Sequence, residues 1–455
     1  MPPPHLISQL AEFVAGATPT VDTGVTEVMR DSLIDTFGCI LVGAAEEVSR
    51  LSRDALDDVA AGDFPVYGSA LRTRPESAAF LNAVAGHALD LDDWEIPGNS
   101  HASVVMLPAL LAAATDNGLS GKSLCTAYLM GFEVIARLGE AVNFEHYARG
   151  WHTTGTLASI GAAAAICRLW QLDADRTANA ISLAVSRAAG LTRQFGSHAK
   201  PLQAGFAAEN ALGAARLARA GLTGQAHVLE GDQGYFALTA HQDHTRHDIP
   251  FSRLGKRLAL EEYGQVLKPY CSCGYTHRII DCARQFHGDS VDTSQIEAIT
   301  IELPDFHAAI LPFRQPANRR EALFSLPFCV AMGLLHGNLT LKDLDRERWN
   351  DTDVRALIAN SEVVPFVPSR PQLNYDPEEP DRLRIRLRSG EIRVTEERFP
   401  RGAPQNPLSL DEVMEKFIAN ASRFRESAAD DLEMLKNWTE LDDLLPLLES
   451  LGVMT

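Results

Sequence analysis

The stretch GFAAENALGAARLARAGLTG, residues 205–224, decides the fold of this chain. Alanine and leucine recur through it without a proline, and Gly221 stands where a glycine commonly ends a helix. The stretch VTEVMRDSLIDTFGCILVG repeats this pattern and closes at Gly43. Small residues such as those at 162–165 let helix backbones approach closely. We therefore predict an all-helical domain over residues 1–265.

The hydrophobic period changes beyond this region. Apolar residues alternate with polar ones over 299–303 and with arginines over 383–387, which is typical of half-buried strands. The pair Ser389-Gly390 then supplies a tight turn into 391–394, so a hairpin is expected. We predict a smaller α+β domain over residues 266–400.

The last segment, residues 401–455, returns to a helical pattern. Ser409, with Glu412 three residues later, forms a capping box ahead of an amphipathic stretch. A short helical tail cannot build a core alone, so it is expected to pack back on the first domain. The predicted fold class is mainly α, with a large helical domain made from both chain ends and an inserted α+β domain.

Composition excludes several classes of protein. The 455 residues are 45% hydrophobic and 22% charged, which is typical of a globular chain. A formal net charge of -19 disfavours nucleic acid and anionic membranes as partners, so an anionic substrate would need cations gathered locally. The N-terminus lacks a secretory pattern, and the apolar run 104–114 is too short to span a bilayer, which predicts a cytoplasmic location.

Seven scattered cysteines are an odd number, which favours reduced thiols over a disulfide framework. No cysteine and histidine series has the spacing of a zinc or iron-sulfur site. We therefore predict no bound metal.

The stretch HALDLDDWEIPGNSHAS, residues 87–103, gathers three aspartates and two histidines. A helix from Pro75 to about Trp94 would place Asp90 on one face with His87 and Trp94, and would leave Asp92 and Asp93 as polar residues of the helix end. Acids at a helix C-terminus oppose its dipole unless a cation answers them. Three interpretations stay open here: a solvated helix end, a functional site, or a metal site that lacks further oxygen ligands.

The stretch HYARGWHTTGTLASIGAAAA begins at residue 146. Thr153 or Thr154 can cap a long helix there, which leaves His152 at a helix N-terminus that attracts anions and favours a neutral imidazole. Tyr147 adds a possible proton carrier. The alternative is that His152 is only a surface residue.

Lys200 directly precedes Pro201 at a predicted helix start, where the helix dipole disfavours a cation. Such a placement invites a functional explanation, and Arg193 and His198 add positive charge nearby.

The stretch LKPYCSCGYTHRIIDCARQ places Lys268 and His277 on either side of a turn rich in cysteine and tyrosine, and Arg278 follows. The alternative is a solvated loop before a helix that starts near His277.

These segments, together with VVMLPALLAAA after His101 and EALFSLPFCVAMGLLHG, occur in the same order in the MmgE/PrpD family, which this chain resembles from about His87 to Gly337 and more weakly elsewhere. The resemblance implies a homodimer that acts without metal or organic cofactor on small polycarboxylates. Its members include 2-methylcitrate and citrate dehydratases, cis-aconitate decarboxylase and an epimerase of iminodisuccinate. The active-site positions of the family fall here on Asp90, His101, His152, Lys200, Lys268 and His277.

The chain departs from the dehydratase and decarboxylase pattern. Trp94 stands where those members have a threonine, Ala102 replaces a proline, and the loop to His101 is one residue longer. We therefore favour an isomerase that epimerises iminodisuccinate. The alternatives are a lyase, either a hydro-lyase of the citrate type or a cis-aconitate decarboxylase, and a polycarboxylate-binding protein without activity.

All these reactions change bonds at a carbon beside a carboxylate, so the site needs a proton carrier and fixed cations. The predicted catalytic residues are Asp90, His101, Tyr147, His152, Lys200, Lys268 and His277. The predicted substrate contacts are Trp94, Arg193, Lys268 and Arg278.

Overall fold

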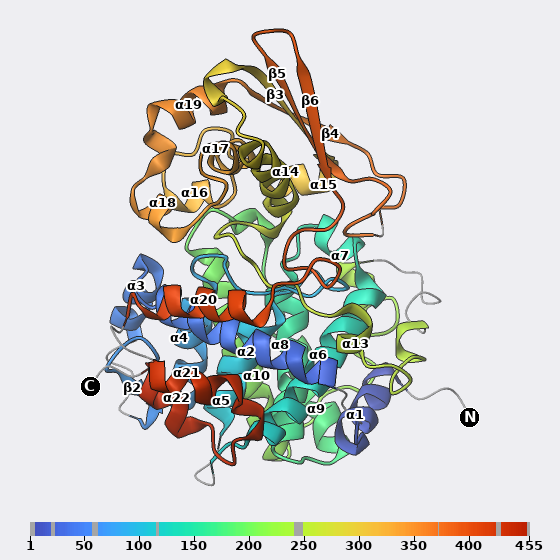
Figure 1. The fold of residues 1–455 in the computed structure, drawn as a ribbon. Helices are drawn as coiled ribbons and strands as arrows, with labels where there is room; N and C mark the ends of the chain where they lie inside the picture. The colour runs from blue at the N-terminus through green and yellow to red at the C-terminus, as the bar shows by residue number, and fades with distance from the viewer. Residues whose placement is uncertain are drawn as a thin grey trace.

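The chain was analysed as a computed structural model that describes residues 5–19, 23–56, 62–114, 118–240, 249–371, 373–424 and 429–452. Its fold is mainly α, which confirms the predicted class. Figure 1 shows a helical body that contains both ends of the described chain and a smaller part, with the larger sheet, stacked on it.

The helical body is built around α8 (Thr153–Leu169), a buried helix that packs against α5, α6, α9 and α10. A side chain at Gly161 would lie 2.6 Å from the carbonyl oxygen of Gly131 in α6, so the two helices need glycine at this crossing. The helices of this body before the sheet are α1 (Leu6–Gly16), α2 (Thr23–Gly43), α3 (Glu47–Leu56), α4 (Pro75–His87), α5 (Ala102–Ala113), α6 (Gly121–Val142), α7 (Glu145–Ala148), α8, α9 (Ala174–Val185), α10 (Ala199–Arg219), α11 (Tyr235–Thr239) and α13 (Ala259–Tyr263), with short strands β1 (Phe64–Pro65) and β2 (Arg72–Thr73).

The C-terminal helices lie on this body, where α20 (Leu410–Ala421) packs against α2 (Figure 1). The predicted capping box is confirmed: the Ser409 hydroxyl accepts a hydrogen bond from the Glu412 amide, and the Glu412 carboxylate accepts one from the Ser409 amide. The last helices are α21 (Ala429–Lys436) and α22 (Leu445–Gly452).

The smaller part holds a four-stranded sheet in the order β4-β3-β5-β6. Strand β3 (Ile296–Pro304) runs parallel to β4 (Ser361–Phe366) and antiparallel to β5 (Asp381–Leu387), which pairs with β6 (Ile392–Glu397). The predicted alternation is confirmed, because Leu383 and Ile385 are buried while Arg384 and Arg386 are exposed. The helices here are α14 (His277–Gly288), α15 (Asp305–Ile310), α16 (Arg319–Ala322), α17 (Leu326–His336), α18 (Leu341–Asp345) and α19 (Thr352–Ala359).

The helix expected to run to Trp94 is shorter, because α4 ends at His87. Asp90 takes a left-handed backbone conformation with φ 51°. Trp94 exchanges two backbone hydrogen bonds with Val266, at 3.0 and 2.9 Å, instead of bonding within a helix. A contact far along the chain therefore ends α4 early, and the prediction was wrong from residue 88 onwards.

All seven cysteines are unpaired thiols, as expected. Among the described residues, no helix combines the length and apolarity that crossing a membrane requires.

Candidate active site

Asp90 holds two lysines that come from distant parts of the chain. Its Oδ1 lies 3.1 Å from Lys200 Nζ and 2.5 Å from Lys268 Nζ, and Lys268 also donates to the Asp90 carbonyl oxygen at 2.8 Å. Burial alone would raise the pKa of Asp90, but the two lysine charges outweigh it and hold that pKa well below its usual range. One carboxylate thus holds two ammonium groups together in the interior of the protein.

Lys268 reaches Asp90 because its strand-like segment is tied to neighbours on both sides. The bridge between Trp94 and Val266 aligns it on one side, and Leu267 donates its amide to Gly402 on the other. Gly402 has φ 92°, and a side chain there would lie 1.8 Å from the Leu267 carbonyl oxygen. Only glycine fits this close approach.

A second chain of contacts runs from Lys200 through two histidines. Lys200 Nζ donates to His87 Nε2 at 2.8 Å, so His87 carries its proton on Nδ1 and donates it to Asp92 at 2.9 Å. His101 Nδ1 lies 3.0 Å from the same carboxylate. Burial lowers the pKa of His87 and lowers the pKa of His101 to about 3, so both rings are neutral at pH 7.

Asp92 and Asp93 are fully buried, so the prediction of polar helix-end residues was wrong for both. That prediction assumed helical geometry, which the early end of α4 removes. Asp93 accepts a hydrogen bond from the Ser103 hydroxyl at 2.5 Å, and burial raises its pKa to about 8. Asp93 is therefore largely protonated at pH 7.

His152 is the N-cap residue of α8, at the helix start that the sequence indicated. Its Nδ1 donates to Gln203 Oε1 at 2.6 Å, which leaves Nε2 as an acceptor. Burial, and to a smaller extent the charge of Lys200, holds the pKa of His152 well below its usual value. Gln203 was missed by the sequence reasoning, although its place three residues after Lys200 on α10 puts both on one helix face.

The expected caps of α8, Thr153 and Thr154, serve the neighbouring loop instead. The Thr153 hydroxyl donates to the Asn99 carbonyl oxygen at 2.6 Å, and the Thr154 hydroxyl accepts the His101 amide at 3.0 Å. These two bonds fix the turn that carries His101.

The side chains of this cluster line a chamber of about 30 Å³. Seven predicted site residues line it: Asp90, Trp94, His101, Tyr147, His152, Lys200 and Lys268. Six lining residues were not predicted: Asn99, Phe195, Cys273, Gly274, Tyr275 and Tyr375.

Three predicted residues do not line this chamber. His277 is buried behind Trp94, with ring centroids 6.0 Å apart, and its Nε2 lies 3.2 Å from the Ser272 carbonyl oxygen. Arg278 is buried in an ion pair with Asp381, and Arg193 is exposed in a neighbouring hollow. The alternative of a solvated loop at 268–277 does not hold, because Lys268 and His277 are fully buried.

Four side chains, His87, Asp90, Asp92 and His101, place possible metal-ligand atoms within 4.8 Å of one another. However, two ammonium groups already lie against Asp90, and His87 and Asp92 bind each other. A divalent cation would meet both lysine charges, so the donor set does not fit a metal ion.

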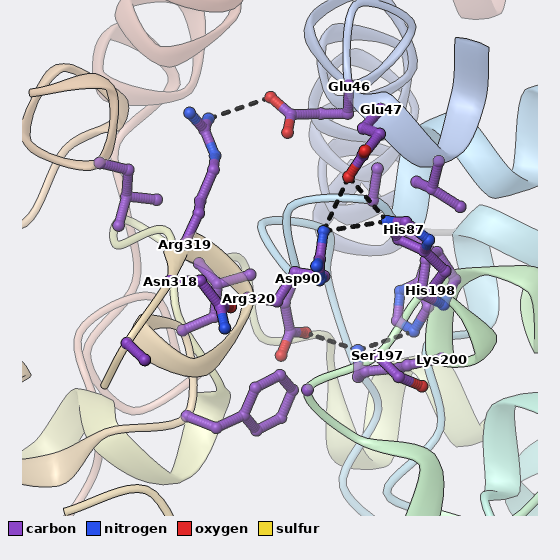
Figure 2. A pocket seen from close by; sticks show the side chains of 18 of the residues that line it. Glu46, Glu47, His87, Asp90, Ser197, His198, Lys200, Asn318, Arg319 and Arg320 are labelled. Atoms are coloured by element: carbon purple, nitrogen blue, oxygen red, sulfur yellow. Dashed lines mark hydrogen bonds and ion pairs between the residues drawn. The ribbon is translucent and has the colours of Figure 1, made fainter. Parts of the chain in front are cut away.

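A wider cavity of about 460 Å³ adjoins the chamber, and its lining includes His87, Asp90 and Lys200 (Figure 2). Figure 2 shows two arginines on one side, with Arg319 directed at Glu46 and Arg320 at Glu47. Arg320 Nη1 lies 2.8 Å from Glu47 Oε2 and Arg319 Nη2 lies 3.0 Å from Glu46 Oε1. These ion pairs join the smaller part to the helical body beside the chamber.

Comparison with known proteins places the chain in a family. Residues 8–247 match the MmgE/PrpD N-terminal domain, and residues 270–440 match the MmgE/PrpD C-terminal domain. The chain is 27% identical to the cis-aconitate decarboxylase of Homo sapiens over 92% of this chain and 88% of that protein. It is 24% identical to the cis-aconitate decarboxylase of Aspergillus terreus over 96% of this chain and 93% of that protein. The chain therefore belongs to the MmgE/PrpD family.

Proposed function

We propose that this member of the MmgE/PrpD family is a lyase that removes carbon dioxide from a small polycarboxylate of the cis-aconitate type, using only its own side chains. The observation that carries the proposal is the buried Asp90 held between Lys200 and Lys268 in the chamber. The relatives that match almost the whole chain are cis-aconitate decarboxylases, which favours this alternative over epimerisation.

The reaction needs cations beside the carboxylates that remain. When the bond to the departing carboxylate breaks, its electron pair moves onto the carbon skeleton and a neighbouring carboxylate takes up part of the charge. Lys200 and Lys268 are placed to stabilise that charge, and both are buried, so water screens their charges little. The sum of the reaction is a tricarboxylate and one proton giving an unsaturated dicarboxylate and carbon dioxide.

A proton must then reach carbon. Tyr147 lines the chamber, and burial holds the pKa of its phenol well above the usual value, so the group keeps its proton for transfer to a carbanion. The Tyr147 phenolate then regains a proton from solvent, and His152 can relay it, because its unprotonated Nε2 takes up a proton that it can pass on. We assign Tyr147 as the proton donor and His152 as the relay that returns a solvent proton to it, with Asp90 positioning both lysines.

Epimerisation of iminodisuccinate, favoured by the sequence because of Trp94 and Ala102, gains no support from these relatives. Trp94 lines the chamber while Ala102 is buried in α5. The substrate difference that these positions suggest is therefore carried by Trp94. The homodimer implied by the resemblance stays part of this proposal, and sedimentation of the purified chain tests it.

The test is to incubate the purified chain with cis-aconitate, 2-methylcitrate, citrate and iminodisuccinate in deuterated water, following carbon dioxide release and NMR spectra. Carbon dioxide from cis-aconitate supports the proposal. Lys200→Met and His152→Gln should each lower the rate at least about 100-fold. The exposed Lys342→Met is the matched control and should keep full activity.

Other outcomes identify the alternatives. Hydrogen exchange with inversion of iminodisuccinate would make the chain an isomerase, and loss of water from a citrate would make it a hydro-lyase. Binding of the acids without any reaction would make it a binding protein.

A further inference from the structure

The hollow that contains Arg193 has a volume of about 930 Å³ and lies on the other side of the chamber wall. It is formed by α7, the turn around residues 192–195, α15 and residues 367–371. Its lining is largely aromatic and aliphatic, with Phe144, Phe306, Ile310 and Phe313 among its members. Val367 is 81% exposed there, so the hollow offers apolar surface to water. Apolar hollows of this volume commonly serve as ligand sites.

The hollow meets the catalytic chamber at two side chains. Tyr147 and Phe195 line both spaces. Phe195 packs edge-on against the His152 ring at 4.9 Å, and Lys200 Nζ lies 5.4 Å from the Phe195 centroid. These two rings therefore separate the two spaces.

The rings continue from the chamber into the hollow. Tyr275 lies 6.4 Å from Tyr147, Tyr147 lies 6.5 Å from Phe144, and Phe144 lies 5.3 Å from Phe306, all between ring centroids. An apolar path therefore leads away from the charged lysines. A polycarboxylate without an apolar group has nothing to place along it.

The cavity of 460 Å³ has a different character. Its lining includes five carboxylates against three permanent cations, and its arginines are already paired with acids across the cavity. In the hollow, by contrast, Arg193 makes no hydrogen bond or ion pair with any described residue, and Arg149 has only Glu145, at 3.9 Å. The hollow therefore combines apolar walls with two arginines against one carboxylate, that of Asp305, and this balance suits an amphipathic anion.

We propose that the substrate class of this enzyme is a polycarboxylate that carries an alkyl chain, with its carboxylates at Lys200 and Lys268 and its chain in the hollow beyond Tyr147 and Phe195. This inference rests on the proposed function, because it assigns a tail to the same reacting acid. Arg193 and Arg149, at the exposed edge of the hollow, attract the anion as it approaches.

The test compares decarboxylation of cis-aconitate with that of analogues bearing methyl, propyl and hexyl chains. Burial of a methylene group favours binding about fourfold, so kcat/KM should rise about two- to fourfold per added carbon until the hollow is filled. A kcat/KM that is independent of chain length, or falls with it, would overturn the proposal.

Two matched variants test whether the alkyl chain of the substrate binds in the hollow. Ala309 is exposed in the hollow and Ala317 is exposed in the 460 Å³ cavity, so Ala309→Trp fills the first and Ala317→Trp fills the second. Ala309→Trp should abolish the preference for the hexyl analogue while the rate with cis-aconitate is kept, and Ala317→Trp should change neither. An unchanged preference in Ala309→Trp, with or without a change of oligomeric state in sedimentation, would contradict the proposal.

Binding without turnover separates the two proposals. Calorimetry measures the binding of succinate and hexylsuccinate, which cannot be decarboxylated in this way. The difference between their two affinities is the contribution of the hollow alone. If hexylsuccinate binds more tightly than succinate and Ala309→Trp removes the difference, the result supports the tail site. This holds even if no acid releases carbon dioxide, because the absence of release would contradict only the proposed reaction. Equal binding of the two acids overturns the tail site.

Discussion

Asp90 combines three properties at the scale of single residues: it is buried, it adopts a left-handed backbone conformation, and it contacts both lysines of the chamber. The left-handed conformation is uncommon outside glycine, asparagine and aspartate. It places the carboxylate and the carbonyl oxygen of one residue within reach of the same ammonium group, that of Lys268.

Replacing Asp90 with asparagine removes the charge that holds the two lysines together. We expect the decarboxylation rate to fall at least about 100-fold while the chain stays folded, because the ammonium groups repel each other once the carboxylate is gone. Steady-state kinetics and circular dichroism measure the two effects. Asp93→Asn is the matched control, since Asp93 is buried in the same loop and does not line the chamber. Equal loss of activity in both variants would count against the role of Asp90.

Asp93 also predicts how stability depends on pH. Burial raises its pKa to about 8 in the folded chain, whereas an unfolded aspartate titrates near pH 4. Between these values the folded chain keeps a proton that the unfolded chain has lost, so this group lowers stability as pH rises from about 4 to 8, by at most about 1.4 kcal/mol per pH unit.

In Asp93→Asn that dependence should vanish, so the melting temperature should fall less between pH 5 and pH 8 than in the unmodified chain. Melting curves at four pH values measure the difference. Parallel pH dependences in the two proteins would show that Asp93 is ionised in the folded state.

Some residues of the chamber could be predicted from the sequence, and others could not. Lys200 and His152 could be found because each sits where a helix start makes its type unusual, and both lie in the chamber. Tyr375 could not be found, because it lies in a loop whose place depends on the packing of the sheet against the helical body. Arg193 and Arg278 were predicted because they are positive charges near these motifs. Charge alone does not reveal that Arg193 faces solvent and that Arg278 pairs with Asp381.

At the scale of elements, α20 near the C-terminus contacts the loop that carries Asp90. Lys416 on α20 forms a buried ion pair with Asp35 on α2 and donates to the Leu91 carbonyl oxygen at 2.8 Å. Burial raises the pKa of Asp35 and the lysine charge opposes this rise. One side chain thus links two helices to the loop that carries Asp90.

Removing one partner of a buried pair leaves an uncompensated charge. Lys416→Met should lower the free energy of unfolding by about 3–5 kcal/mol, seen as a lower melting temperature. The double variant Asp35→Asn with Lys416→Met should recover part of this loss, because no buried charge is left alone. Additive losses in the double variant would show that the two groups do not act as a pair.

Element boundaries were the weaker part of the prediction. The alternating strands, the hairpin and the capping box follow from local sequence, and all three are confirmed. The end of α4 does not follow from local sequence, because the backbone bridge to Val266 replaces helical hydrogen bonds beyond His87. Since the chamber is built on that loop, this single boundary changed the interpretation of Asp92 and Asp93.

At the scale of the whole molecule, the chamber lies where the helical body meets the smaller part. Asp90, His152 and Lys200 come from the helical side, while Tyr275 and Tyr375 come from the chain around α14 and β5. Side chains from both parts line this one space. The side chains on both sides must therefore meet the same substrate.

The most direct test of this account is the turnover of uniformly carbon-13-labelled cis-aconitate in deuterated water, followed by NMR. Each labelled molecule should release one labelled carbon dioxide, yield one five-carbon unsaturated dicarboxylate and gain one deuterium on carbon. Tyr147→Phe should slow this reaction without changing its products. Labelled cis-aconitate that keeps all six carbons in the presence of the folded chain would contradict the account.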